Sequence, residues 1–156
     1  MQKDMIKITR NGDVYVDARL VECIFTVDQA KVQNFLSVCN QPIINYIISS
    51  KEARTVMITD SGTIYISDIK TQTLKNRLSE CGINLLCIVG SNAYISYRKI
   101  EALIDHDKEE NYIPIFIEDK ATSNTGQVIR SFVRMQSGHT YPSTFNQRTL
   151  IKKSRK

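Results

Sequence analysis

The sequence predicts an α+β fold of two similar β-rich modules in tandem, with small antiparallel sheets built from hairpins and with short helices. The frame Ser-Gly-x-x-Tyr-x-Ser-x-x-x-x-x-Thr-Leu occurs at 61–74 and again at 137–150, an offset of 76 residues. Upstream, "VDARLVECIF" (16–25) aligns with "ISYRKIEALI" (95–104) at an offset of 79. Letters, order and spacing all agree, so we favour duplication over chance similarity of two short motifs.

Composition sets the class of protein. The chain has 156 residues, of which 42% are hydrophobic and 24% charged, as is typical of soluble globular domains. We expect the modules at 1–79 and 80–156. Modules this small bury a small share of their surface, so they should share a core or assemble further. The chain begins without an apolar signal segment, and "INLLCIVG" is too short to span a bilayer. We therefore expect a cytoplasmic protein without membrane contact.

The first half of the first module reads as a hairpin, a strand and a helix. Residues 5–16 form two short apolar runs around Asn11-Gly12, a dipeptide suited to tight turns. A strand is expected at 21–25. Asp28 is placed to cap a helix with apolar residues near helical spacing, which Pro42 would end.

A second hairpin completes that module. Residues 54–67 turn at Asp60-Ser61-Gly62, where glycine supplies the turn conformation. Ser67 or Asp68 is expected to cap a short final helix through Leu78.

The second module repeats this order with one divergent segment. "INLLCIVGSNAYIS" predicts a hairpin, and "KIEALIDH" follows it. In place of the amphipathic helix stands a strand-like stretch around 113–117 and then a polar loop. Pro142 in the last hairpin indicates an edge strand, because proline cannot donate to a ladder. A final helix carries a basic tail.

No motif points to an enzyme, a metal or a cofactor. The cysteines (Cys23, Cys39, Cys81 and Cys87) form no C-x-x-C pair, and small buried thiols are expected. His106 and His139 have no partner at a recognisable triad spacing. The acidic run at 105–110 does not follow a calcium-loop pattern, so a solvated loop is expected.

Charge points to an acidic partner. The net charge is +5, and no Asp or Glu occurs between Ala121 and Lys156. Such a block often contacts nucleic acid, although a solubilising tail remains the alternative. Its basic residues are Arg130, Arg134, Arg148, Lys152, Lys153, Arg155 and Lys156.

Four stretches of the first module, "VDARLVECIF", "NFL", "ARTVMITDSGTIYIS" and "TQTLKNR", resemble in order and spacing the RemA/RemB family of small bacterial biofilm-matrix regulators. "SNAYISYRKIEALID" and "SGHTYPSTFNQRTLIKK" extend the resemblance to the second module. Members usually have one module, and the first copy here looks closer to the RemB branch. The resemblance implies a module akin to LytTR-type DNA-binding domains, assembly into rings or arcs, and arginines arrayed on DNA.

Carried over by position, the resemblance places DNA-binding arginines at Arg19 and Arg98 and a basic cluster at Lys51 to Arg54. The sequence departs from the family there, because Glu52 stands where RemA-like members have arginine. Gln127 and Val128 replace the cluster in the second copy, where Arg130 remains. A structural role for Arg19, paired with Asp17, is the alternative to a phosphate contact.

We therefore expect a non-enzymatic bacterial transcription regulator that binds double-stranded DNA and self-assembles into a ring, an arc or another homo-oligomer. The rival hypothesis is an oligomeric assembly protein that has lost most of its DNA binding. A small-ligand-binding version of the same assembly is a third possibility.

Overall fold

The structure is a computed structural model of the chain. It describes residues 4–10, 14–28, 32–33, 35, 37, 46–47, 53–90, 92–105, 111–113, 115 and 129–154. The strands are β1 (Met5–Lys7), β2 (Tyr15–Asp17), β3 (Val21–Thr26), β4 (Tyr46–Ile47), β5 (Thr55–Thr59), β6 (Ile64–Ser67), β7 (Leu85–Val89), β8 (Ala93–Ser96), β9 (Ile100–Asp105), β10 (Ser131–Met135) and β11 (Thr140–Ser143). Among the described residues, the helices of eight or more residues are α2 (Thr71–Glu80) and α3 (Gln147–Ser154).

The described strands form three sheets, and the α+β class predicted from the sequence is confirmed. A six-stranded sheet has the order β4-β6-β5-β3-β8-β7, a three-stranded sheet the order β11-β10-β9, and β1 pairs with β2 alone. The β3–β8 ladder joins the two halves of the sequence, because β8 adds to the sheet that β3, β5 and β6 begin.

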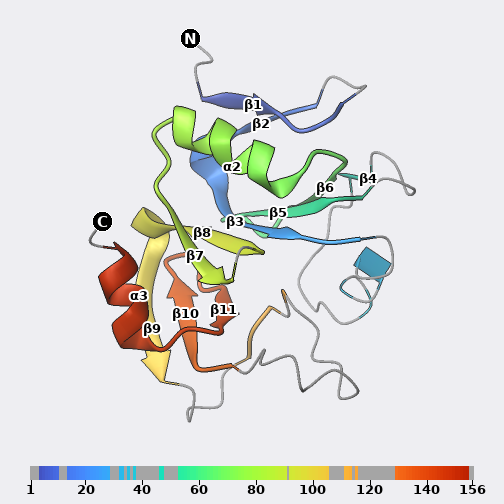
Figure 1. Ribbon diagram of the computed structural model, residues 1–156. Coiled ribbons are helices and arrows are strands. Elements are labelled where there is room, and N and C mark those ends of the chain that lie inside the picture. Colours follow the sequence, from blue (N-terminus) through green and yellow to red (C-terminus); the bar gives the residue numbers. More distant parts are fainter. Residues whose placement is uncertain are drawn as a thin grey trace.

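The six-stranded sheet is covered on both faces (Figure 1). The β1–β2 hairpin and α2 lie against one face, and the three-stranded sheet with α3 lies toward the other. Successive side chains of β3 therefore enter two different cores: Cys23 and Phe25 one, Ile24 the other. Burial on both sides explains why apolar residues occupy the successive positions 23–25 of the strand instead of alternating with polar ones.

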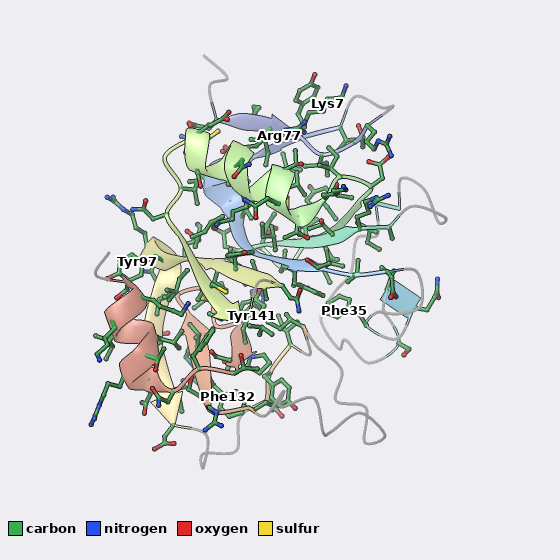
Figure 2. All side chains as sticks on the ribbon, in the orientation of Figure 1. Lys7, Phe35, Arg77, Tyr97, Phe132 and Tyr141 are labelled. Atoms are coloured by element: carbon green, nitrogen blue, oxygen red, sulfur yellow. The ribbon has the colours of Figure 1, made fainter. Side chains whose placement is uncertain are left out.

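The side chains fill these two layers (Figure 2). Phe35, packed edge-on against Phe25 at 5.2 Å between ring centroids, and Tyr141 belong to the larger cluster. That cluster contains residues from both halves of the sequence, so the two halves share a core. In the part of the chain that the structure describes, no helix has both the length and the apolar character needed to cross a membrane.

Equivalent hydrogen bonds recur in the two halves. The Arg54 amide donates to the Ser67 carbonyl at 2.9 Å, and the Arg130 amide donates to the Ser143 carbonyl at 2.8 Å. The Ser67 hydroxyl donates to the Ile8 carbonyl, and the Ser143 hydroxyl to the Ile88 carbonyl. These bonds define positional counterparts between the halves.

The matching turns also correspond. Gly62 and Gly138 both have a positive φ, of 87° and 96°, as the turn glycines predicted from the sequence require. Each half also has a one-turn 3₁₀ helix before its longest strand, η1 (Ala18–Leu20) and η2 (Tyr97–Lys99).

One predicted cap is wrong. The residue before α2 is Lys70, which makes no side-chain cap, so neither Ser67 nor Asp68 caps the helix. The Ser67 hydroxyl instead accepts from the Ile69 amide, and the Asp68 carboxylate accepts from the Arg10 amide at 2.9 Å. Tertiary contacts with the first hairpin therefore take up both candidate caps.

Of the other local predictions, some agree with the structure and others are corrected by it. β11, which holds Pro142, pairs with β10 alone among the described strands, as an edge strand does. Ile113 and Ile115 are buried but lie outside any strand. The rest of that stretch and most of the helix after Asp28 lie outside the described residues. Cys23 is buried, whereas Cys81 and Cys87 are half-buried, which corrects the expectation of buried thiols at those two positions.

Candidate nucleic-acid interface and the joint between the halves

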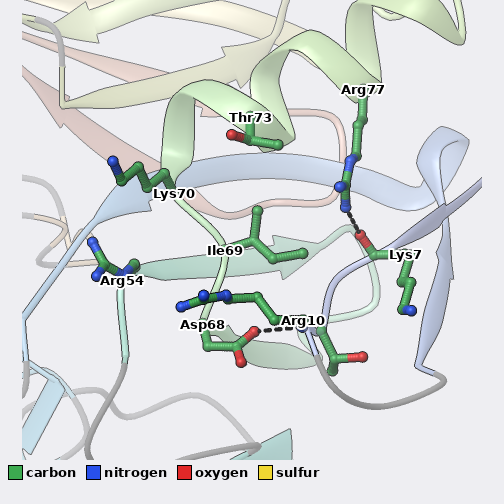
Figure 3. A pocket seen from close by; sticks show the side chains of 9 residues that line it. Lys7, Arg10, Arg54, Asp68, Ile69, Lys70, Thr73 and Arg77 are labelled. Carbon is green, nitrogen blue, oxygen red and sulfur yellow. Dashed lines mark hydrogen bonds between the residues drawn. The ribbon is translucent and has the colours of Figure 1, made fainter.

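A basic pocket of about 620 Å³ lies where α2 begins (Figure 3). Its lining combines the first hairpin, the residue before β5, the segment between β6 and α2, and the first two turns of α2. Five of the lining residues are basic, and Asp68 is the one carboxylate among them. The basic residues are Lys7, Arg10, Arg54, Lys70 and Arg77.

Two contacts hold this pocket in shape. The Arg77 guanidinium reaches from α2 to the Lys7 carbonyl at 2.6 Å, which ties the helix to β1. The Asp68 carboxylate accepts the Arg10 amide, so the carboxylate is held by backbone while the Arg10 side chain stays exposed. Lys70 and Arg54 are also exposed. The pocket thus presents several solvent-facing cations around one anchored carboxylate.

Two groups in the pocket lack the hydrogen bonds expected of them. Because Lys70 gives α2 no side-chain cap, the first amides of the helix have no side-chain acceptor from that position. Thr9 is 1% exposed, and its hydroxyl has no hydrogen-bond partner among the described residues. A buried polar group without a partner costs about 1–3 kcal/mol, so it calls for an explanation.

Among the described residues of the second half, three of the five basic positions of the pocket are uncharged. The counterparts of Lys7, Arg10 and Lys70 are the uncharged residues Cys87, Gly90 and Asn146. Asn146 also caps its own helix, since its side chain accepts the Thr149 amide at 2.8 Å.

Arg19 is tied to carboxylates. Its guanidinium contacts Asp17 at 2.9 Å and Asp4 at 3.3 Å, and the hydrogen bonds from Arg19 lower the pKa of Asp17. This is the structural pairing that the sequence left open as an alternative. Its counterpart Arg98 is exposed and follows Ser96 in place of the aspartate, so the two arginines have different surroundings.

The remaining predicted DNA-binding residues do not gather in one place. Arg54 lines the basic pocket, whereas Arg130, Arg148 and Lys152 are exposed on the second half. Lys153 lies over the Phe145 ring at 4.4 Å, and Arg134 is half-buried in β10. Lys51 and Arg155 lie outside the described residues.

Sequence reasoning missed four basic residues of the pocket. Lys70 and Arg77 stand two helical turns apart, so they share a helix face. The seven-residue spacing could have indicated from the sequence that these two cations lie side by side. Lys7 and Arg10 carry no such signal in the sequence, because only the packing of the first hairpin on α2 brings them to the same pocket.

The joint between the halves is the second built feature. In the β3–β8 ladder Ile24 stands opposite Tyr94, which is 7% exposed. Tyr94 belongs to a core cluster with Ala18, Val21, Ile24, Leu74 and Leu78, and the Lys75 ammonium lies 4.9 Å from its ring centroid. A tyrosine from the second half thus fills a groove in the first half.

A buried polar cluster reinforces that joint. The Glu22 carboxylate, fully buried, accepts the Tyr141 hydroxyl at 2.5 Å and the Ser137 hydroxyl at 2.7 Å. His139 Nδ1 lies 2.5 Å from the same carboxylate, which raises the pKa of His139 above its ordinary value. At the edge of the joint, Lys99 pairs with Asp60 at 2.8 Å. All four of these contacts join the first half to the second.

The surfaces equivalent to this joint at the two ends of the chain are exposed. Tyr15, the counterpart of Tyr94, is 51% exposed. The second half has a groove of about 280 Å³ where the first half holds Tyr94, and β9 and β2 each have only one described partner strand. We call this feature the α3 groove; it is lined by Leu86, Tyr97, Ile100, Leu103, Leu150, Ile151 and Ser154.

Comparison with known proteins gives one match. The model of the RemA-like family, described as "Extracellular matrix regulatory protein A-like", matches residues 5–78. No curated protein and no solved structure matches the chain.

Proposed function

From the match of residues 5–78 to the model of the RemA-like family, we propose that the chain is a non-enzymatic regulator of that family whose chains assemble head to tail. In this assembly the second half of one chain receives the first hairpin of the next. The description of that family, "Extracellular matrix regulatory protein A-like", supports the regulatory part of the proposal.

One observation carries the assembly. Tyr94 is buried in the groove of the first half, while its counterpart Tyr15 is half-exposed and the α3 groove stands open. Five residues that line the α3 groove (Tyr97, Ile100, Leu103, Leu150 and Ser154) are counterparts of the five core residues named above around Tyr94. The same fit between chains would bury Tyr15 as Tyr94 is buried.

Strand pairing sets the register of the proposed contact. Ile24 opposite Tyr94 translates into Leu103 of one chain opposite Tyr15 of the next. Adding β2 to the edge of β9 would satisfy backbone groups on both strands. The polar cluster has counterparts too: Glu101, which is exposed, would face Tyr65 of the next chain. Because the two contacting surfaces differ, the assembly closes into a ring or continues as a filament.

The test uses chains that are blocked at one end. Tyr15→Asp should prevent insertion of residue 15 into the α3 groove of the neighbouring chain. Ile151→Asp should place a charge in the α3 groove itself. Each variant alone should be monomeric by light scattering. An equimolar mixture should form a complex of two chains, because each variant keeps the end that the other lacks.

A matched control checks the groove itself. Ile151→Lys copies Lys75, which lies over Tyr94, so this variant should keep the mass of the wild-type assembly. If both Asp variants assemble as the wild type does, the proposed joint is wrong. If they are monomeric but do not pair in the mixture, the contact is not head to tail.

A second function, binding of duplex DNA, is favoured by the charge of the described surface. The exposed cations Arg148 and Lys152 on α3 have no acidic neighbour in that part of the sequence, and the basic pocket adds further positive charge. Phosphate contacts of this kind weaken steeply with salt. Repetition along a head-to-tail assembly would place such cations at regular intervals along a duplex.

Salt-titrated binding to a duplex of arbitrary sequence tests this part. Neutralising Arg148 and Lys152 together should make the log–log salt slope shallower by about 0.9 for each lost phosphate contact. Lys152→Arg keeps the charge and should leave the slope unchanged. If the intact protein binds no duplex at low salt, the rival hypothesis of an assembly protein without DNA binding takes the place of this one.

A further inference from the structure

We propose that the basic pocket of the first half is a binding site for a single phosphate group, held at the uncapped start of α2. The phosphate could belong to the DNA backbone or to a free phosphorylated small molecule, and the chemistry of recognition is the same. The proposal goes beyond the head-to-tail assembly and shares only its DNA arm with the proposed function.

The start of α2 supplies the first part of the site. α2 has ten residues, and its N-terminal amides and dipole favour an anion. The hydroxyl of Thr71 in the first turn is hydrogen-bonded with Thr26 and Thr55 at 2.8 Å. This hydroxyl is therefore engaged elsewhere and does not cap the first amides of the helix. Asp68 and Ser67 are held by the first hairpin. An external acceptor can therefore complete this end of the helix.

Thr9 supplies the second and independent part. Its side chain is buried, it lines the same pocket, and its hydroxyl has no partner within the described residues. A phosphate oxygen would give that hydroxyl an acceptor. A hydroxyl, helix amides and exposed cations together form the donor set that a phosphate requires.

Asp68 does not oppose an anion as a free carboxylate would. It is 3% exposed, and one oxygen accepts the Arg10 amide, so part of its charge is already engaged. Around it stand the exposed cations Arg10, Arg54 and Lys70. The positive charges outnumber the one carboxylate in the lining.

The second half provides the internal comparison. There Asn146 caps α3, Val89 replaces Thr9 and Gly90 replaces Arg10, so the helix end is closed from within, and the hydroxyl and one of the exposed cations are gone. A merely structural role would not require the first half to leave its helix uncapped and a hydroxyl buried without a partner. The difference points to a ligand for the first half alone.

The experiment measures binding of pyrophosphate by calorimetry, with sodium chloride of equal ionic strength as the reference. Lys70→Asn, which installs the cap of the second half, and Thr9→Val, which installs its apolar residue, should each weaken binding about tenfold. Lys75→Asn makes the same chemical change on α2 outside the pocket lining and should leave pyrophosphate binding unchanged. The mass of each variant, by light scattering, should equal that of the wild type.

A duplex-binding assay on the same variants separates the two sources of phosphate. If Lys70→Asn and Thr9→Val weaken duplex binding in parallel, the site holds the DNA backbone. If duplex binding is unchanged, or absent even in the wild type, while pyrophosphate binding is lost, the site holds a free phosphorylated ligand. The proposal is overturned if the wild type binds no pyrophosphate above the salt reference, or if Lys70→Asn and Thr9→Val bind it as tightly as the wild type.

Discussion

At the scale of single residues, Glu22 shows how strongly one buried carboxylate depends on its partners. It is fully buried in β3, where isolated charge would be costly, and three side chains of the second half contact it. The joint between the halves therefore includes a polar lock as well as apolar packing.

The Tyr141 hydroxyl tests that lock. Tyr141→Phe keeps the ring and removes one donor to Glu22, so the free energy of unfolding should fall by about 1–3 kcal/mol. Urea unfolding followed by circular dichroism measures this. Tyr65→Phe, the same change at the half-buried counterpart, should cost much less; an equal loss in both variants would contradict the role given to Glu22.

The His139 contact makes stability depend on pH. The hydrogen bond to Glu22 raises the pKa of His139 above 6.5, so the folded state holds the proton more tightly than the unfolded state does. The stabilisation is complete below the unfolded pKa and is lost as pH rises through the folded pKa. The wild type should thus exceed His139→Gln in free energy of unfolding at about pH 6, and the difference should shrink by about pH 9.

Paired urea titrations at the two pH values check this prediction. A difference that stays constant, or grows toward high pH, would show that His139 does not hold its proton for Glu22.

At the scale of elements, the two final helices differ in how they begin. α3 has the Asn146 cap, whereas α2 starts from Lys70 without one, although both follow equivalent hairpins. An uncapped helix is a local loss of stability, which makes sense when a ligand can restore it.

Lys70→Asn should therefore make the free protein more stable while it weakens phosphate binding. A good cap contributes about 0.5–2 kcal/mol to the free energy of unfolding. Thermal unfolding in phosphate-free buffer measures the gain, and Lys70→Ala serves as the control without a cap. If Lys70→Asn is no more stable than Lys70→Ala, an added side-chain cap does not stabilise α2, and the proposal that its first amides need an acceptor is contradicted.

At the scale of the whole molecule, assembly and DNA binding should respond differently to salt. The proposed contact between chains consists mainly of backbone pairing and apolar burial, which salt does not screen, whereas phosphate contacts release counterions. Raising the salt from about 50 to about 200 mM should release the duplex and leave the assembly mass unchanged.

Light scattering and duplex binding on one sample across this range give the answer. Dissociation of the assembly in parallel with loss of DNA would show that charge, and not the Tyr15 contact, holds the chains together.

Truncation needs care at this scale. Cutting after Leu150 removes Lys152 and Lys153, but it also removes half of α3 and two residues of the α3 groove, Ile151 and Ser154. Point substitutions are therefore the sharper way to ask what the basic end of the chain contributes.

The sequence by itself determined the local features of this protein. Hairpin turns at glycines, the edge strand with Pro142 and the repeated frame all depend on residues close together in the chain, and the described structure has each hairpin where the pattern placed it. The pairing of Arg19 with Asp17 was also foreseeable, because the partners are two residues apart.

Only the tertiary structure decided the sites. Ser67 and Asp68 looked like helix caps, but the first hairpin, 58 residues or more away in sequence, takes both of them. The basic pocket and the Glu22 lock likewise join residues from distant segments, up to 119 residues apart for Glu22 and Tyr141. Local patterns fix which elements form, because those depend on neighbours; which side chains meet depends on how strands pair, and β8 pairing with β3 is a choice that no short stretch of sequence encodes.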